Sequence, residues 1–450
     1  MRLAMLLTLS LMLAPPAALA SGTWASSGHG ATVQSNGDLL TGSGASVSLW
    51  AETPSEAGFA GAITSLDAAQ WHGHEITLSG SITVLQGNGA AALWIRADGA
   101  DGSLAFRNSA ASPVKAADGA QSRAVSLYVP ASATSIKLGA TLQGLGQVSV
   151  GSLRLQGTRE PDTEISAYEV LEAAMDVMEA QALGADRVDW PAERRRRLTP
   201  ALNSAPAREA HPVILNLVRQ LDDRHSAWQP ARDAADYQAR ATPTHPAQVN
   251  VSDGIGYISV PGLAGTDREQ GDAFSADLCQ AIERQTNPAV RGWIVDLRRN
   301  GGGNMWPMLA GLRALLGDHS PGAFVDRAGA SSPWRIRRTE DCSSDLSNVP
   351  VAVLIGPNTA SSGEAVAVAF RARRETRFFG LPTAGLATSN RSIELPDQSM
   401  LMLTTAVFTD RLGNTYPTGI APDVQEEGDR APRNAAHAWL RTKPWPDRPQ

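Results

Sequence analysis

The sequence VPVAVLIGPNTASSGEAVAVAF, from Val349 to Phe370, joins two apolar runs through a short polar turn. The first run, Val349–Gly356, is short and bounded by turn residues, which is typical of a buried strand. The second run follows Ser361 and suits a buried helix. A strand followed directly by a helix predicts an α/β domain.

Ser361 begins the second run, three residues before Glu364, and this spacing has two interpretations. Ser-x-x-Glu is the capping box, in which the serine only starts a helix. Alternatively, Ser361 is a nucleophile at a helix N-terminus, where free N–H groups stabilise developing negative charge. The local sequence is compatible with both interpretations.

Strand and helix patterns alternate on either side of this segment. The predicted strands are Gly254–Gly262, Arg291–Arg298, Thr376–Gly380 and Ser399–Asp410, and the predicted helices are Asp272–Gln285 and Met305–Gly317. We therefore predict an α/β domain with a mostly parallel sheet over residues 249–427, followed by a C-terminal tail, 428–450. Both DLRRNGGG (Asp296–Gly303) and PNTASSGE (Pro357–Glu364) follow buried strands. Because ligands bind beyond the carboxyl ends of parallel strands, the two segments are expected to converge.

The chain before residue 249 has two different characters. Residues 21–158 are rich in Gly, Ser, Ala and Thr, with short alternating segments such as Glu75–Leu85, and they predict an antiparallel β-sandwich of jelly-roll type. This part weakly resembles galactose-binding-like modules, which implies a glycan or peptide ligand. The pattern changes to helical at Gly157–Glu164, so residues 159–248 are predicted to be a helical segment and linker.

The first 20 residues read as a cleavable signal peptide, with Arg2, an apolar run and a cut after Ala20. No later apolar stretch is long enough to span a membrane, so we expect a secreted or periplasmic chain. Two cysteines, Cys279 and Cys342, are compatible with one disulfide or with two buried thiols. No metal site is indicated. Charged residues make up 19% of the chain and the net charge is -6, which gives no basic footprint for nucleic acid.

A serine nucleophile needs a base and an oxyanion hole. Gly301, Gly302 and Gly303 follow a buried strand, where backbone N–H groups can approach a ligand closely, although a flexible turn would look the same. His225 stands where an amphipathic helix, His211–Trp228, ends. Alone it is compatible with a base or with a capping or surface histidine.

Five segments, in this order, resemble the S41 peptidases: YISVP, GWIVDLRRNGGGNMWPML, PVAVLIGPNTASSGEAVAVAF, RFFGLPTAGLAT and GIAPDV. The resemblance covers residues from about Glu160 to Glu427 and implies a catalytic core of the ClpP/crotonase type. It also implies a nucleophile at Ser361. The oxyanion hole would be formed by the backbone N–H groups of Gly302 and Ser362.

The two branches of this family use different bases. The processing-protease branch has a lysine about 25 residues after the serine, where this sequence has Leu386. The tricorn-like branch has a histidine at a D-x-H-[ST] helix end, which DDRHSAW matches, so the resemblance implies His225 as the base. No PDZ module fits between Trp228 and Val249.

The sequence departs from the tricorn-like pattern at two positions. The serine expected just before the histidine is Arg224, with Ser226 following it. The glutamate expected before GIAPD is absent, and Asp410 is the nearest upstream acid. Asp410 and Ser226 are therefore the candidates for orienting His225.

Together, these observations predict an exported serine peptidase that acts on a peptide or protein substrate. The alternatives are a catalytically silent ligand-binding protein on the same fold and a serine esterase. No metal or organic cofactor is implied.

Overall fold

The computed structural model describes residues 23–28, 31–40, 44–52, 58–100, 102–110, 112–159, 164–287, 289–337 and 342–443. The predicted signal peptide lies outside these residues, as do residues 444–450 of the predicted tail. The chain divides into two compact units. One contains residues up to Glu172 together with Arg195–Asn216, and the other contains Ala173–Arg194 together with the chain from Leu217 onward.

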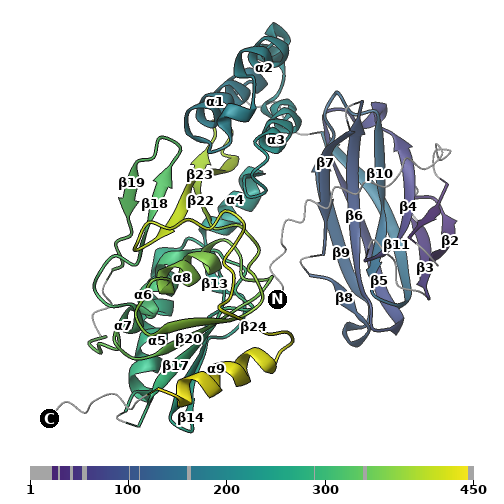
Figure 1. The fold of residues 1–450 in the computed structure, drawn as a ribbon. Coiled ribbons are helices and arrows are strands. Elements are labelled where there is room, and N and C mark those ends of the chain that lie inside the picture. The colour runs from purple at the N-terminus through teal and green to yellow at the C-terminus, as the bar shows by residue number, and fades with distance from the viewer. Residues whose placement is uncertain are drawn as a thin grey trace. The chain divides into compact units, whose positions relative to one another are not determined.

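The first unit contains two antiparallel sheets (Figure 1). Their orders are β1-β4-β10-β6-β7, with β8 on β6, and β2-β3-β11-β5-β9. The strands are β1 (Ala25–Ser27), β2 (Ala31–Gly37), β3 (Ala45–Ala51), β4 (Ala60–Asp67), β5 (His74–Gly87), β6 (Ala90–Gly99), β7 (Gly102–Asn108), β8 (Val114–Lys115), β9 (Gln121–Tyr128), β10 (Ser135–Gln143) and β11 (Gly146–Arg159).

Alternating burial along these strands explains the two layers. In β5, Ile76, Leu78 and Ile82 are fully buried, while Thr77, Ser79 and Ser81, which face the other way, are partly exposed. Apolar side chains of both sheets belong to one buried cluster. The predicted antiparallel, mostly β N-terminal region is confirmed.

Helices follow in the sequence, as the periodicity predicts. The boundary between the two compact units passes through these helices. α1 (Ala167–Gln181), α2 (Trp190–Arg197) and α3 (His211–Gln220) each contribute residues to both units. Within the first unit, Arg208 forms an ion pair with Glu75 at 2.7 Å, and the Tyr128 hydroxyl donates to Glu209 at 2.9 Å. The first unit therefore includes helical residues as well as the sheets.

The second unit is built on the sheet β14-β15-β17-β20-β21-β24. Only the β14–β15 pair is antiparallel, so the mostly parallel sheet is present. Its strands are β14 (Gln248–Ser252), β15 (Ile255–Ser259), β17 (Gly292–Asp296), β20 (Val351–Ile355), β21 (Thr376–Gly380) and β24 (Val424–Gln425).

Helices cover both faces of this parallel sheet. α5 (Arg268–Gln285), α6 (Met305–Gly311) and α8 (Ser362–Phe370) share a buried cluster with Trp293, Val295 and Val353. α9 (Ala431–Arg441) packs against the alternate residues, Ile294 and Leu354. Near-continuous apolar strands are required because neither face meets water.

The strand predicted at Ser399–Asp410 belongs to a second, antiparallel sheet, β12-β23-β18-β19 with β22 on β23. Its strands are β12 (Ala227–Gln229), β18 (Gly322–Asp326), β19 (Ser331–Pro333), β22 (Thr388–Glu394) and β23 (Met400–Asp410). β22 and β23 are joined by a short turn, and such a turn can connect only antiparallel strands. The unit also has α4 (Ala231–Gln238), α7 (Arg313–Leu316) and the pair β13 (Ala241–Pro243) and β16 (Leu263–Gly265).

The two cysteines form a disulfide between Cys279, on α5, and Cys342. This resolves the choice between a disulfide and two free thiols. The bond joins segments 63 residues apart in the sequence.

Candidate active site

Ser361 lies at the tip of the turn that leads from β20 into α8, immediately before the first helical residue. Its backbone has φ 53° and ψ −121°. A positive φ is uncommon for a residue with a Cβ, and such strained residues cluster at functional sites.

Glu364, in the first turn of α8, is fully buried and accepts hydrogen bonds from the turn that carries Ser361. Its Oε2 accepts from the backbone N–H groups of Ser361 at 3.1 Å and Leu386 at 2.7 Å. Its Oε1 accepts from the Thr383 hydroxyl at 2.6 Å and the Gly385 N–H at 3.0 Å. Burial raises the pKa of the Glu364 carboxyl, and these four donors oppose that effect. The glutamate thus joins the serine turn to the segment that precedes β22.

The glycine turn after β17 lies against this serine. Gly302 has φ 104°, and a Cβ there would lie 2.9 Å from the Ser361 Cβ and 3.1 Å from the Ser362 nitrogen. The Ser362 hydroxyl donates to the Gly303 carbonyl at 2.5 Å. The two strand ends therefore converge as expected, and only glycine fits at position 302.

The N–H groups of Gly302 and Ser362 differ in their partners. The Gly302 N–H donates to the Asn300 Oδ1 at 3.0 Å. Among the described residues, no acceptor is found for the Ser362 N–H. Ser362 therefore offers an open donor beside Ser361, whereas Gly302 is occupied within its own turn.

His225 contacts Ser361 although the two residues are 136 positions apart. The His225 Nε2 lies 2.9 Å from the Ser361 Oγ, and its Nδ1 lies 2.7 Å from the Thr388 Oγ1. The turn after α3 is held by Asp223, whose Oδ1 accepts from the N–H groups of His225 at 2.9 Å and Ser226 at 2.7 Å. Burial lowers the pKa of the His225 imidazole to about 4, and the nearby Asp223 charge opposes this only in part.

Neither predicted orienting candidate contacts the imidazole. Asp410 accepts from the hydroxyl of Tyr416 at 2.6 Å and from Asn414 and Leu412, in its own turn after β23. The Ser226 hydroxyl donates to the Asp223 Oδ2 at 2.6 Å. The oxygens of Asp410 are thus used within its own turn, and the Ser226 hydroxyl also accepts from the Thr404 N–H of β23 at 2.9 Å.

The geometry also shows what two further residues, Leu386 and Thr388, contact at the site. Leu386, where the other branch has lysine, contributes its backbone N–H to Glu364. The partner of the imidazole that sequence reasoning missed is Thr388, 163 residues from His225. No local pattern identifies it, because a threonine at the start of a strand is common.

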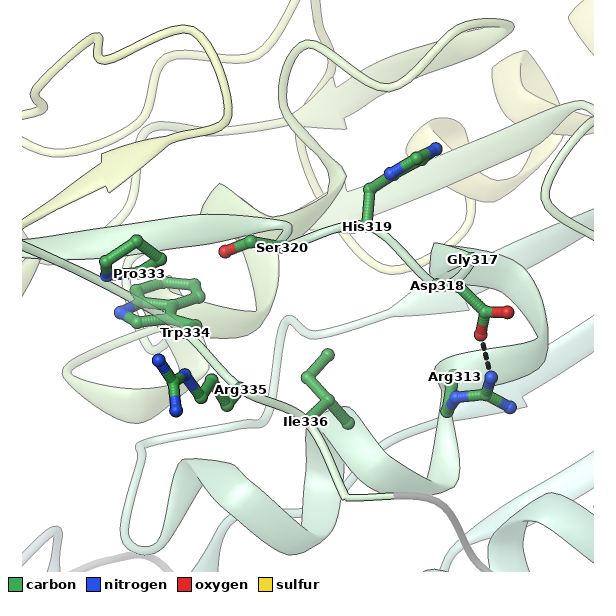
Figure 2. Close-up of a pocket in the computed structure, with 9 residues that line it drawn as sticks. All are labelled: Arg313, Gly317, Asp318, His319, Ser320, Pro333, Trp334, Arg335 and Ile336. Carbon is green, nitrogen blue, oxygen red and sulfur yellow. Dashed lines mark ion pairs between the residues drawn. The ribbon is translucent and has the colours of Figure 1, made fainter.

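Two cavities lie elsewhere in this unit. One, of about 370 Å³, is lined by Arg313 of α7, by residues 317–320 and by Pro333, Trp334, Arg335 and Ile336. Figure 2 shows the ion pair between Arg313 and Asp318 at one side of the lining. The other, of about 540 Å³, lies at the carboxyl ends of β15, β17, β20 and β21 and includes Gly356–Asn358 of the serine turn. Ser361 and His225 line neither cavity.

In the part of the chain that the structure describes, no group of three or more His, Cys, Asp or Glu side chains is arranged to hold a metal ion. At the site itself, the structure places a serine hydroxyl beside an imidazole whose pKa is lowered to about 4 by burial. A neutral imidazole can take the serine proton and activate the oxygen as a nucleophile.

Comparison with known proteins shows which family this region matches. The model of peptidase family S41 matches residues 254–426. A nisin-resistance protein of Lactococcus lactis is 27% identical over 62% of this chain and 88% of its own length. Carboxyl-terminal-processing peptidase 3 of Arabidopsis thaliana chloroplasts is 31% identical over 36% of this chain and 32% of its own length.

A carboxy-terminal-processing protease of Bartonella bacilliformis is 28% identical over 54% of this chain and 53% of its own length. The chain thus spans about a third to a half of these processing peptidases. Among solved structures, a lipoprotein from Streptococcus agalactiae matches with a TM-score of 0.54 and 25% identity, over 63% of this chain and 99% of that one. The resemblance to S41 peptidases is confirmed.

Proposed function

We propose that this chain is a serine peptidase with Ser361 as nucleophile and His225 as general base, since residues 254–426 match the model of peptidase family S41. The observation that carries the proposal is the 2.9 Å contact between the His225 Nε2 and the Ser361 Oγ. This distance lies within the hydrogen-bond reach that a nucleophile and its base require.

The proposed reaction begins when the Ser361 Oγ attacks the carbonyl carbon of the scissile peptide bond and its proton passes to the His225 Nε2. The tetrahedral intermediate then collapses, and the imidazolium returns that proton to the leaving amine. In the second half, His225 takes a proton from water, and the resulting hydroxide attacks the acyl carbonyl carbon. When this second tetrahedral intermediate collapses, the imidazolium returns the proton to the Ser361 Oγ and the acid product leaves.

The oxyanion of the intermediate needs preorganised donors. The Ser362 N–H is the first of these in our proposal, because no protein acceptor is found for it in the described part of the chain. The Gly302 N–H is the second. It donates to Asn300 in this structure, so it must share or exchange that partner when the oxyanion forms.

The proposal is tested with a fluorophosphonate probe, which labels activated serines. Ser361→Ala should abolish labelling and peptide hydrolysis and leave the melting temperature within a few degrees. Ser362→Ala, which retains its backbone N–H, serves as the control and should still be labelled. Labelling that survives in Ser361→Ala would show that another serine is the nucleophile.

The alternatives give different results in the same assay. A ligand-binding protein without activity would not be labelled in any form. An esterase would be labelled but would turn over ester and not peptide substrates. The hydrogen-bonded serine and histidine favour the catalytic alternatives.

The substrate class follows from the relatives. The carboxyl-terminal-processing relatives are named as a peptidase and a protease, so we propose a peptide or protein substrate for this chain. A glycan or peptide ligand of the N-terminal sheets stays a prediction from the sequence.

We also propose that the chain is exported. The predicted signal peptide and the Cys279–Cys342 disulfide both favour this, because disulfides persist in oxidising compartments. No helix within the described ranges has both the length and the apolar character to cross a membrane. Mass spectrometry of the mature protein should find an N-terminus after Ala20.

A further inference from the structure

We propose that Thr388 is the positioning residue of His225: its hydroxyl oxygen accepts the Nδ1–H of the imidazole and thereby presents Nε2, free of a proton, to Ser361. The inference deepens the proposed function and rests on it. It assigns the orienting role to a neutral hydroxyl, where the family pattern predicted an acid.

The proposed role of His225 as base specifies the tautomer, and both ring contacts are compatible with it. The distances are 2.7 Å from Nδ1 to the Thr388 Oγ1 and 2.9 Å from Nε2 to the Ser361 Oγ. A neutral imidazole carries one N–H and one acceptor nitrogen. Only with the proton on Nδ1 can Nε2 accept the serine proton, and the threonine oxygen is then the acceptor that this N–H needs.

β22 holds the backbone of His225 as well as its ring. Asn390, two residues after Thr388, donates from Nδ2 to the His225 carbonyl at 2.7 Å. The Asn390 Oδ1 in turn accepts from the Thr404 hydroxyl of β23 at 2.9 Å. β22 therefore contributes both to the position of the residue and to the orientation of its side chain.

The charged side chains near the His225 ring all have other hydrogen-bond partners, so the positioning role falls to Thr388. Asp223 bonds backbone N–H groups and the Ser226 hydroxyl, and Arg224 donates to the Gly385 carbonyl at 3.3 Å. On α8, Glu364 bonds three N–H groups and Thr383, and on β22, Arg391 donates to Gln181. None of these side chains hydrogen-bonds the imidazole, so a hydroxyl dipole replaces the usual carboxylate.

Three substitutions of Thr388 test the inference in the full chain. Thr388→Val keeps the volume and removes the acceptor, and it should lower kcat roughly 10- to 100-fold with little change in KM. Thr388→Ser keeps the hydroxyl and should restore most of the activity. Thr388→Asp places a carboxylate on Nδ1 and should move the acid limb of the kcat/KM profile upward by about 1–3 pH units.

The upward pH shift is the decisive readout, because a merely structural threonine would not produce it. Ser392→Ala, on the same strand but bonded to the Met402 sulfur, is the matched control and should leave both rate and profile unchanged. If Thr388→Val has the wild-type kcat, or if Thr388→Asp has the wild-type pH profile, the inference is wrong even though the serine peptidase proposal survives.

A measurement on the wild-type chain guards against variants that fail to fold. The ¹⁵N shifts of the His225 ring at pH 7 should show a protonated Nδ1 and an unprotonated Nε2. The opposite tautomer would overturn the role of Thr388. Full labelling of His225→Ala, in contrast, would overturn the proposed function itself.

Discussion

Ser361 keeps a positive φ because several separate contacts hold its turn. The Gly363 N–H donates to the Ala360 carbonyl at 2.8 Å, and the Ala360 N–H donates to the Asn300 carbonyl at 3.1 Å. Glu364 holds the N–H of Ser361 itself. Strain of this kind persists only where the surrounding structure overdetermines it. The capping box and the nucleophile are thus compatible, since the same glutamate that caps the helix also positions the serine.

The pKa of His225 predicts an unusually acidic limit of activity. An exposed histidine titrates near 6.5, and an unperturbed base would lose activity through roughly pH 6 to 7. Burial lowers the pKa of His225 to about 4, so the base stays neutral to lower pH. We expect kcat/KM to be constant down to about pH 5 and to fall as the pH decreases through about 4. A limb near pH 6.5 in the measured profile would contradict this environment.

Gly302 offers a second prediction at the residue scale. Gly302→Ala should reduce turnover by 100-fold or more, roughly the effect of losing an oxyanion donor, because the methyl group would lie 2.9 Å from the Ser361 Cβ. Gly329→Ala is the control: its φ is 82°, also positive, but no atom lies within 4 Å of the added methyl group. Equal activity losses in the two variants would attribute the effect to φ strain rather than to the collision.

At the scale of elements, one buried carboxylate connects α8 to the segment that leads into β22. Glu364 lies on the helix, and its partners Thr383, Gly385 and Leu386 precede the strand that carries Thr388. The Glu364 carboxylate therefore helps to fix the position of Ser361 relative to that of Thr388. The lysine position of the other family branch, Leu386, here serves this connection through its backbone.

Glu364→Gln tests that connection. The amide would point donors at N–H groups that now meet a carboxylate, so we expect the free energy of unfolding to fall by roughly 2–4 kcal/mol and probe labelling to slow. Glu394→Gln, at an exposed position on β22, should change stability by less than about 0.5 kcal/mol. Chemical denaturation provides the measurement. Wild-type stability in Glu364→Gln would mean that the turn holds without this carboxylate.

At the scale of the molecule, the disulfide restrains the unit that contains the site. It closes a loop between residues 63 positions apart and ties α5, which covers the parallel sheet, to the segment before β20. The serine and histidine lie on other segments. Reduction of the disulfide should therefore lower the free energy of unfolding without abolishing the reaction of Ser361.

Reduction is expected to lower the free energy of unfolding by about 2–4 kcal/mol, as the loss of loop closure predicts. Under native conditions the reduced protein should still react with the probe. Denaturation curves with and without reductant measure the effect, and the double variant Cys279→Ala/Cys342→Ala should be insensitive to reductant. An unchanged midpoint in the wild type would show that the bond adds no stability.

The sequence by itself determined the features that depend on short-range patterns. Alternation predicted the antiparallel N-terminal strands, and apolar runs ending in turns predicted β17, β20 and the helix after Ser361. Other element limits were missed: the helix expected over Met305–Gly317 breaks at Leu312, and α5 begins earlier, where Asp267 accepts from the Gln270 N–H. The motif residues could be identified from the sequence because each follows the end of a strand or helix, and the residues next to it in the sequence indicate where that strand or helix ends.

Only the tertiary structure decided which side chains meet. Thr388 reaches His225 because β22 pairs with β23 in a defined register, which places Thr388 opposite Val407 and shifts between Ser389 and Asn390. A different register at Thr388 would turn its side chain to the opposite face. Asp410 is closer to the expected motif in the sequence, yet its own turn uses its oxygens. Register and long-range packing are set by the whole core, so no local pattern encodes the partner of the histidine.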